Sequence, residues 1–174
     1  MLEKLRSRLV QLGPSLVRTP IVLTPFALKR QLLEQLLGWQ FRQALEEGEL
    51  DFLEERWLSI NVRDIGLRWL TSVQDGKLVV REQGQADVSF SADANDLLLI
   101  AARKQDPDTL FFQRRLAIEG DTELGLYVKN LMDAIELDAM PKALRVLLTQ
   151  LADFVEAGLK TAPPAKETSV GEAC

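Results

Sequence analysis

The feature that most constrains the fold is a β-hairpin signal near the middle of the chain. The pair Asp75-Gly76 separates two short stretches, residues 67–74 and 77–82, that are rich in apolar and β-branched residues. Asp-Gly is a preferred pair in two-residue hairpin turns, because such turns require positive φ angles. In the first stretch the apolar residues alternate along the chain, which places them on one face of a strand. The sequence therefore predicts an antiparallel hairpin with one buried face.

Three further stretches have the length and composition of strands. They cover residues 57–62, 86–90 and 114–120. In the first of them Leu58, Ile60 and Val62 share one face, and Gly84 marks a turn before the second. The sequence therefore predicts five strands in all.

The N-terminal part is expected to hold two helices with an irregular segment between them. Residues 2–12 have leucines at helical spacing among basic residues, and Gly13-Pro14 is expected to end this amphipathic helix. Residues 15–27 are strongly apolar but contain two prolines, so we expect an irregular or bent segment there. A longer helix is predicted from about residue 25 to residue 47, with apolar residues recurring on one face.

Four helices are predicted in the second half of the chain. They cover residues 91–104, residues 106–112, a segment from Asp121 to about Leu137, and a segment that starts near Pro141. Ser91 and Asp93 are candidate N-caps of the first helix, because their side chains can accept hydrogen bonds from free backbone N–H groups. Asp106 is the candidate cap of the second, with Pro107 at its first helical position.

The helix expected after Asp121 has more apolar surface than one packing stripe requires. The stripe at helical spacing consists of Leu124, Val128, Leu131 and Ile135. The additional apolar residues are Leu126, Tyr127 and Met132. A surface helix usually needs a single stripe to meet a core. The extra residues therefore either line an apolar cavity or belong to an ordinary filled core.

Composition excludes several classes of site. The 174 residues include no histidine and one cysteine, Cys174, so Ser-His-Asp and Cys-His catalysis and Cys/His zinc sites are impossible. We expect no metal, no cofactor and no catalytic residues, and the sequence has no glycine-rich phosphate loop. No apolar run approaches the ~20 residues needed to span a bilayer, and there is no secretory signal. These features are typical of a cytoplasmic protein.

Charge is distributed unevenly along the chain. Residues 1–30 contain six basic residues and one acidic residue, a net charge of +5, which leaves −10 for the rest because the total is −5. Such a basic arm suits an anionic surface, whereas the acidic remainder argues against nucleic-acid binding. The residues expected to contact a membrane are Lys4, Arg6, Arg8, Arg18, Ile21, Val22 and Leu23. The alternative is that this apolar arm folds back and closes the core.

The order of these elements resembles the sterol carrier protein 2 (SCP2) family over about residues 38–137. In that family a strand ends in Gly-Asp or Gly-Asn and continues into an apolar helix. The residues that carry this pattern here are Ile118, Glu119, Gly120, Asp121, Leu124, Leu126 and Leu131. The resemblance implies an α/β (α+β) fold, with a five-stranded, mostly antiparallel, twisted sheet covered by helices that enclose an apolar tunnel.

The layout also divides the chain. We expect an amphipathic, apolar N-terminal extension at residues 1–37 and an SCP2-like lipid-binding domain at residues 38–137. A C-terminal helix is expected at residues 138–160 and a disordered tail at residues 161–174. This arrangement resembles a bacterial branch of the family, the accessory factors of oxygen-independent ubiquinone biosynthesis.

The resemblance implies a non-catalytic lipid-binding factor. It would hold a polyprenyl lipid or phospholipid and work beside other ubiquinone-pathway proteins, including factors that resemble peptidase family U32, in the cytoplasm or at the inner membrane surface. The candidate tunnel residues are Leu97, Ile100, Phe111, Phe112, Leu124, Leu126, Tyr127, Leu131 and Ile135. The alternative is an interaction scaffold whose core is filled and binds no lipid.

Overall fold

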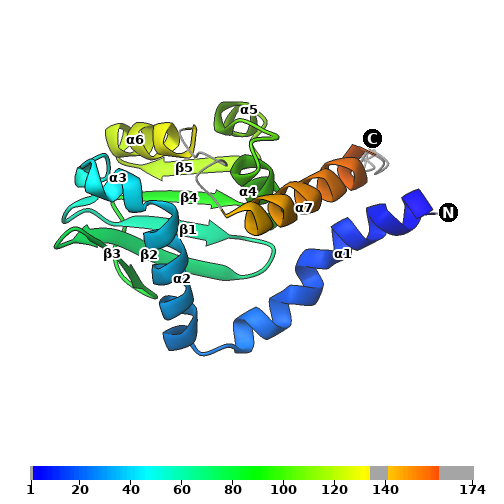
Figure 1. Cartoon of the computed structure of the whole chain (residues 1–174), viewed down its shortest axis with the longest axis horizontal. Helices are drawn as coiled ribbons and strands as arrows, with labels where there is room; N and C mark the ends of the chain where they lie inside the picture. The colour runs from blue at the N-terminus through cyan, green and yellow to red at the C-terminus, as the bar shows by residue number, and fades with distance from the viewer. Residues whose placement is uncertain (1, 134–140, 161–174) are drawn as a thin grey trace, which may run out of the picture.

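A five-stranded sheet with helices packed against it forms the centre of the computed structural model, which describes residues 2–133 and 141–160 (Figure 1). The strands are β1 (Leu58–Val62), β2 (Leu67–Gln74), β3 (Lys77–Arg81), β4 (Val88–Ala92) and β5 (Leu116–Gly120). Their order in the sheet is β3-β2-β1-β4-β5, with β1 and β4 parallel and the other neighbours antiparallel. The predicted mixed fold and its mostly antiparallel sheet are confirmed.

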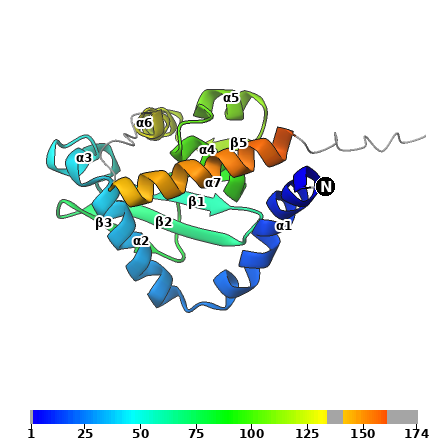
Figure 2. The ribbon, with the colours of Figure 1, turned by 45° about the vertical axis from the view of Figure 1, so that its right-hand side comes forward.

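Helices precede, interrupt and follow the strands. They are α1 (Leu2–Leu23), α2 (Phe26–Gln40), α3 (Arg42–Glu46), the 3-10 turn η1 (Asp51–Leu53), α4 (Ala94–Ala101), α5 (Pro107–Phe112), α6 (Thr122–Asp133) and α7 (Lys142–Lys160). Helices α1 and α2 form a V that opens toward α7 in both ribbon views (Figures 1 and 2). The tail expected at residues 161–174 and the candidate Ile135 lie outside the described residues.

The hairpin turn follows the sequence prediction. Asp75 and Gly76 have φ angles of 50° and 70°, and they connect β2 to β3 where Gln74 pairs with Lys77. At the outer edge of the sheet, the Glu34 carboxylate of α2 accepts a hydrogen bond from the Val80 N–H at 3.0 Å. An edge strand has unpaired N–H groups that can pair with other chains, so α2 covers part of that edge.

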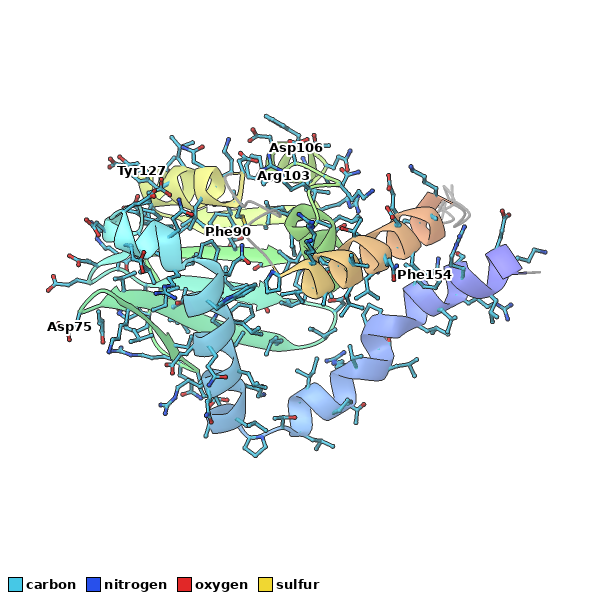
Figure 3. The ribbon with its side chains drawn as sticks, viewed as in Figure 1. Asp75, Phe90, Arg103, Asp106, Tyr127 and Phe154 are labelled. Carbon is cyan, nitrogen blue, oxygen red and sulfur yellow. The ribbon has the colours of Figure 1, made fainter. Side chains whose placement is uncertain are left out.

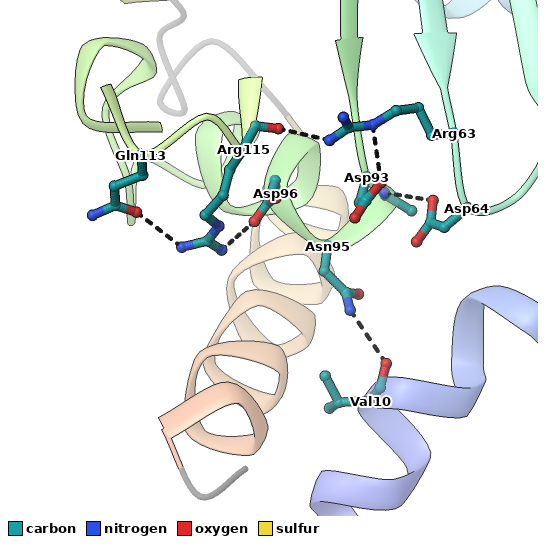
Figure 4. Close-up of polar contacts among 9 residues, drawn as sticks. Val10, Arg63, Asp64, Asp93, Asn95, Asp96, Gln113 and Arg115 are labelled. Atoms are coloured by element: carbon teal, nitrogen blue, oxygen red, sulfur yellow. Dashed lines mark hydrogen bonds and ion pairs between the residues drawn. The ribbon is translucent and has the colours of Figure 1, made fainter. Parts of the chain in front are cut away.

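The predicted end of the first helix is wrong, because α1 continues through Gly13-Pro14 and beyond Pro20. Proline has no N–H, so Pro14 leaves the Val10 carbonyl without its usual partner four residues later. The Asn95 side-chain amide of α4 donates a hydrogen bond to this carbonyl at 3.2 Å (Figure 4). A contact with a distant part of the chain thus replaces the bond that Pro14 removes, and the expected irregular segment at residues 15–27 is largely helical.

Two other boundaries differ from prediction. The fourth strand extends to Ala92, so the candidate cap Ser91 lies within β4 and cannot cap α4. Asp93 occupies the N-cap position, but its carboxylate accepts a hydrogen bond from Arg63, and Asp64 accepts the hydrogen bond from the Ala94 N–H instead (Figure 4). The long helix predicted at residues 25–47 is divided into α2 and α3 at Phe41, whose φ of −104° lies outside the helical range.

The main core lies between the sheet and the helices. Alternate residues of β1, β4 and β5 point to one side of the sheet, as the strand period requires. Buried members of this cluster include Leu58, Val88, Phe90, Ala92, Ile100, Leu110, Leu116, Leu124 and Val128. A second, smaller cluster joins α1, α4 and α7 through Val10, Leu99, Ala102, Ala152 and Val155. Through this cluster, α4 and α7 hold α1 against the domain.

Candidate functional site

Helix α6 begins at a turn that only glycine can form. Gly120 has a φ of 108°, and a Cβ atom at this position would lie 2.4 Å from the carbonyl oxygen of Asp87. Asp121 follows, and its carboxylate accepts a hydrogen bond from the Leu124 N–H at 2.9 Å. This hydrogen bond, together with the charge of Arg56, lowers the pKa of the Asp121 carboxyl. The Gly-Asp pair therefore sets the starting point and direction of α6.

The stripe of α6 is buried or half-buried, and of the three additional apolar residues Met132 also packs against the core. Leu124 and Val128 belong to the main core, and Leu131 packs against it. Leu126 and Tyr127 are about half exposed, and the Tyr127 ring stacks on Phe52 with 5.4 Å between the ring centroids. Figure 3 shows Tyr127 at the outer side of α6. The additional apolar surface of α6 is thus only partly covered by the described chain.

The predicted tunnel residues fall into two groups. Leu97, Ile100, Leu124 and Leu131 come together in the main core cluster, from α4 and α6. Phe111 and Phe112 lie on α5, where they form an edge-to-face pair at 5.8 Å, and Phe112 is 81% exposed. Their role as lipid contacts, like that of the first group, stays a prediction.

A hollow of about 310 Å³ reaches the edge of this core. Ile100 and Met132, which belong to the main core or pack against it, line it together with the charged segment that connects α4 to α5. Arg103 and Asp106 of this segment lie at the upper side of the molecule in Figure 3. Asp106 caps α5 as predicted, since its carboxylate accepts a hydrogen bond from the Thr109 N–H at 2.8 Å. The volume is at the lower end of the range of small-molecule sites.

The basic N-terminal residues lie along α1. Lys4, Arg8 and Arg18 are exposed, whereas Arg6 is half-buried. Near the end of the helix, Val22 and Leu23 are exposed and Ile21 is half-buried. A Cβ atom built on Gly66, in the β1–β2 turn, would lie 3.5 Å from a methyl group of Val22. One side of α1 therefore packs on the domain and another side is open.

Sequence reasoning did not find how α7 packs. The helical spacing of apolar residues after Pro141 predicts one packing side made of Leu144, Leu147, Leu148, Leu151, Phe154 and Val155. In the structure the buried residues of α7 are Ala152, Val155 and Gly158, so Val155 is the one member of the predicted set that is buried. A Cβ atom on Gly158 would lie 2.5 Å from a methyl group of Val10, so this glycine lets α1 and α7 come together. Small residues within a leucine-rich helix were the available signal for this contact.

Two properties of the described residues bear on the type of site. Residues 2–133 and 141–160 contain no group of three or more carboxylate or thiol side chains placed to hold a metal ion. None of the helices in these ranges has both the length and the apolar character that crossing a bilayer requires.

Comparison with known proteins shows which protein family the chain belongs to. The SCP-2 sterol transfer family matches residues 33–133, which is more than half of the chain. The chain therefore belongs to this family, as the resemblance indicated. The match begins within α2 and ends at the last residue of α6, so α1 and α7 lie outside it. The division at residues 37, 137 and 160 stays a prediction.

The particular relatives are similar over the entire chain. The chain is 78% identical to "Ubiquinone biosynthesis accessory factor UbiT" of Escherichia coli (strain K12), over 100% of both chains. The protein of the same name in Escherichia coli O157:H7 matches equally. Among solved structures, "UbiJ-SCP2 Ubiquinone synthesis protein" has a TM-score of 0.52 and 22% identity, covering 64% of this chain and 100% of that chain. At that identity the likeness supports the fold alone.

Proposed function

We propose that the chain is a non-catalytic accessory factor of ubiquinone biosynthesis, in its oxygen-independent form, that binds lipid through its SCP2 domain. The observation that carries the proposal is the 78% identity to the UbiT protein over the full length of both chains. The family match adds the domain type, since SCP-2 is described as a sterol transfer family. The lack of histidine agrees with a carrier role, because it removes the most common general base.

The proposed ligand is the polyprenyl chain of a pathway intermediate. Such a chain is almost insoluble in water, and burial of each methylene contributes ~0.8 kcal/mol. Leu97, Ile100, Leu124 and Leu131 offer an apolar wall between α4, α6 and the sheet. The hollow beside Ile100 and Met132 is the proposed mouth, where the polar head group would stay accessible to partner enzymes.

The proposed setting is the membrane surface, with other pathway proteins as partners. These partners include factors that resemble peptidase family U32. The basic residues Lys4, Arg6, Arg8 and Arg18 would lie near anionic head groups, and Ile21, Val22 and Leu23 would contribute apolar contacts. The protein would remain in the cytoplasm and associate with the inner membrane from that side.

The test is native mass spectrometry of the chain purified gently from its own cells, with identification of any bound lipid. We expect a polyprenyl lipid or a phospholipid to accompany the wild-type chain. Leu131→Asp places a charge against the proposed wall and should lower the lipid content several-fold, because an unpaired charge there would have to leave water. Val79→Asp is the control, since Val79 is half-buried and outside the proposed wall.

The runner-up function is an interaction scaffold that binds no lipid. Wild-type chain that is free of lipid in repeated preparations, yet still associates with pathway proteins, would favour the scaffold. A folded Leu131→Asp variant with unchanged lipid would show that the proposed wall is misplaced.

A further inference from the structure

Helix α1 has a second apolar face in addition to the one that packs on the domain. Ser7 and Val10 are buried, and Val10 packs against residues of α4 and α7. A different stripe, spaced by four, three and four residues, runs along the open side of the helix. It consists of Leu5, Leu9, Leu12 and Leu16, each at least 46% exposed. Such a stripe on a helix that has already buried another face calls for something to cover it.

Helix α7 continues this face across a hollow. Leu147, Leu151 and Phe154 share one side of α7 because they are four and three residues apart, and all three are exposed. Phe154 lies on the side of α7 toward α1 (Figure 3). A hollow of about 340 Å³ between the helices is lined by Glu3, Leu5, Arg6 and Leu9 of α1 and by Phe154. The two stripes form one surface, which we call the α1–α7 face.

Charge indicates what covers the α1–α7 face. Lys4, Arg8 and Arg18 are exposed on α1, and residues 1–30 carry a net charge of +5. Arg6 lines the hollow, and its Nε–H is buried and has no hydrogen-bond acceptor among the described residues. A guanidinium group binds phosphate oxygens well, because its donors are charged and fixed in a planar fork.

A second copy of the chain is a poorer occupant. Most homodimers have twofold symmetry, in which a patch contacts the same patch of its partner. Dimerisation through α1 would therefore bring two sets of positive charge together, which is unfavourable. An anionic bilayer offers apolar chains to the leucines and phosphate groups to the arginines in the same layer.

We propose that the α1–α7 face docks on the surface of an anionic phospholipid bilayer, with Arg6 in contact with a lipid phosphate in the hollow beside Phe154. The inference rests on the proposed function, since a carrier of membrane-soluble intermediates must meet the bilayer to load. The proposed membrane-contacting surface includes α7 and the leucines of the middle of α1 in addition to the basic residues of α1. An amphipathic surface of this type lies in the interface plane with its apolar residues among the upper acyl chains.

The experiment is vesicle flotation of the full chain with phosphatidylglycerol-rich and with phosphatidylcholine vesicles. The wild-type chain should float with the anionic vesicles, and raising the salt from 0.1 M to 1 M should weaken binding, because the Debye length falls from ~10 Å to ~3 Å. Leu9→Glu and Leu147→Glu should each weaken vesicle binding about tenfold, because each replaces an inserted leucine with a charge.

The matched control is Val146→Glu. Val146 precedes Leu147 on the same helix and is 52% exposed, compared with 53% for Leu147. Consecutive helical residues point about 100° apart, so Val146 lies off the stripe. This variant should bind vesicles like the wild type, as should Val146→Ser. Arg6→Gln should weaken binding to anionic vesicles while leaving the weak binding to neutral vesicles unchanged.

Three results would overturn the inference. The first is that the wild-type chain does not bind anionic vesicles, and the second is that Leu147→Glu and Val146→Glu lose vesicle binding equally. The third is that Leu147→Glu changes only the oligomeric state in native mass spectrometry. Measuring the amount of carried lipid in the same samples tests the proposed function independently of this inference. A Leu147→Glu chain that keeps its lipid but leaves the vesicles supports the docking face, whereas wild-type chain that floats without carried lipid refutes the carrier role alone.

Discussion

The start of α6 and the middle of α1 are both places where a residue restricts the backbone, yet only the first could be predicted. At α6, Gly120 and Asp121 act on neighbouring atoms: the glycine permits a φ of 108° and the carboxylate caps the helix three residues later. At α1, Pro14 should end the helix, but Asn95, 85 positions after Val10, donates the missing hydrogen bond to the Val10 carbonyl. Hydrogen bonds and backbone angles set by neighbouring residues can be predicted from the sequence, whereas a hydrogen-bond partner that lies far away along the chain cannot.

The largest expected effect is at Gly120. In Gly120→Ala, the new Cβ atom would have to lie 2.4 Å from the Asp87 carbonyl oxygen, at a φ that L residues avoid. We expect the free energy of unfolding to fall by about 3 kcal/mol, measured by urea denaturation. Gly38→Ala is the control, because nothing lies within 4 Å of that position in α2. It should be neutral or stabilising by up to about 1 kcal/mol, since alanine favours helix. Equal losses of unfolding free energy in both variants would mean that the turn before α6 does not require glycine at position 120.

The same distinction explains how much of the molecule could be predicted. All five strands, the hairpin turn at Asp75-Gly76 and the capped α5 followed from period, turn residues and caps. The continuation of α1 and the close approach of Val10 to Gly158 depend on contacts between segments far apart in sequence. The sequence pattern marked Phe112 and Leu124 alike as apolar, but whether each is buried depends on how the elements pack.

Removal of the distant partner should have a smaller effect than the change at Gly120. Asn95→Ala leaves the Val10 carbonyl without its donor, and we expect a loss of about 1 kcal/mol in the free energy of unfolding. Pro14→Ala restores an N–H at the position that would normally bind this carbonyl. In the Pro14→Ala background, Asn95→Ala should therefore cost clearly less, as a double-mutant cycle on urea denaturation would measure. If the effects of Asn95→Ala and Pro14→Ala on the free energy of unfolding are strictly additive, Asn95 does not compensate for Pro14.

The smallest expected effect is a pH dependence at the start of α6. The hydrogen bond from the Leu124 N–H, with help from Arg56, lowers the folded-state pKa of Asp121. Since the folded pKa lies below the unfolded value of about 4, the cap contributes its stability above pH 4 and loses it as pH falls through the lowered value. We expect the wild-type chain to lose more stability than Asp121→Asn between pH 5 and the lowest pH at which it stays folded. Asn retains a capping oxygen but does not titrate, so the difference between the two chains isolates the carboxylate. Identical pH profiles in thermal unfolding would mean that the charge of Asp121 contributes nothing to the α6 turn, and that the cap acts through its hydrogen bond alone.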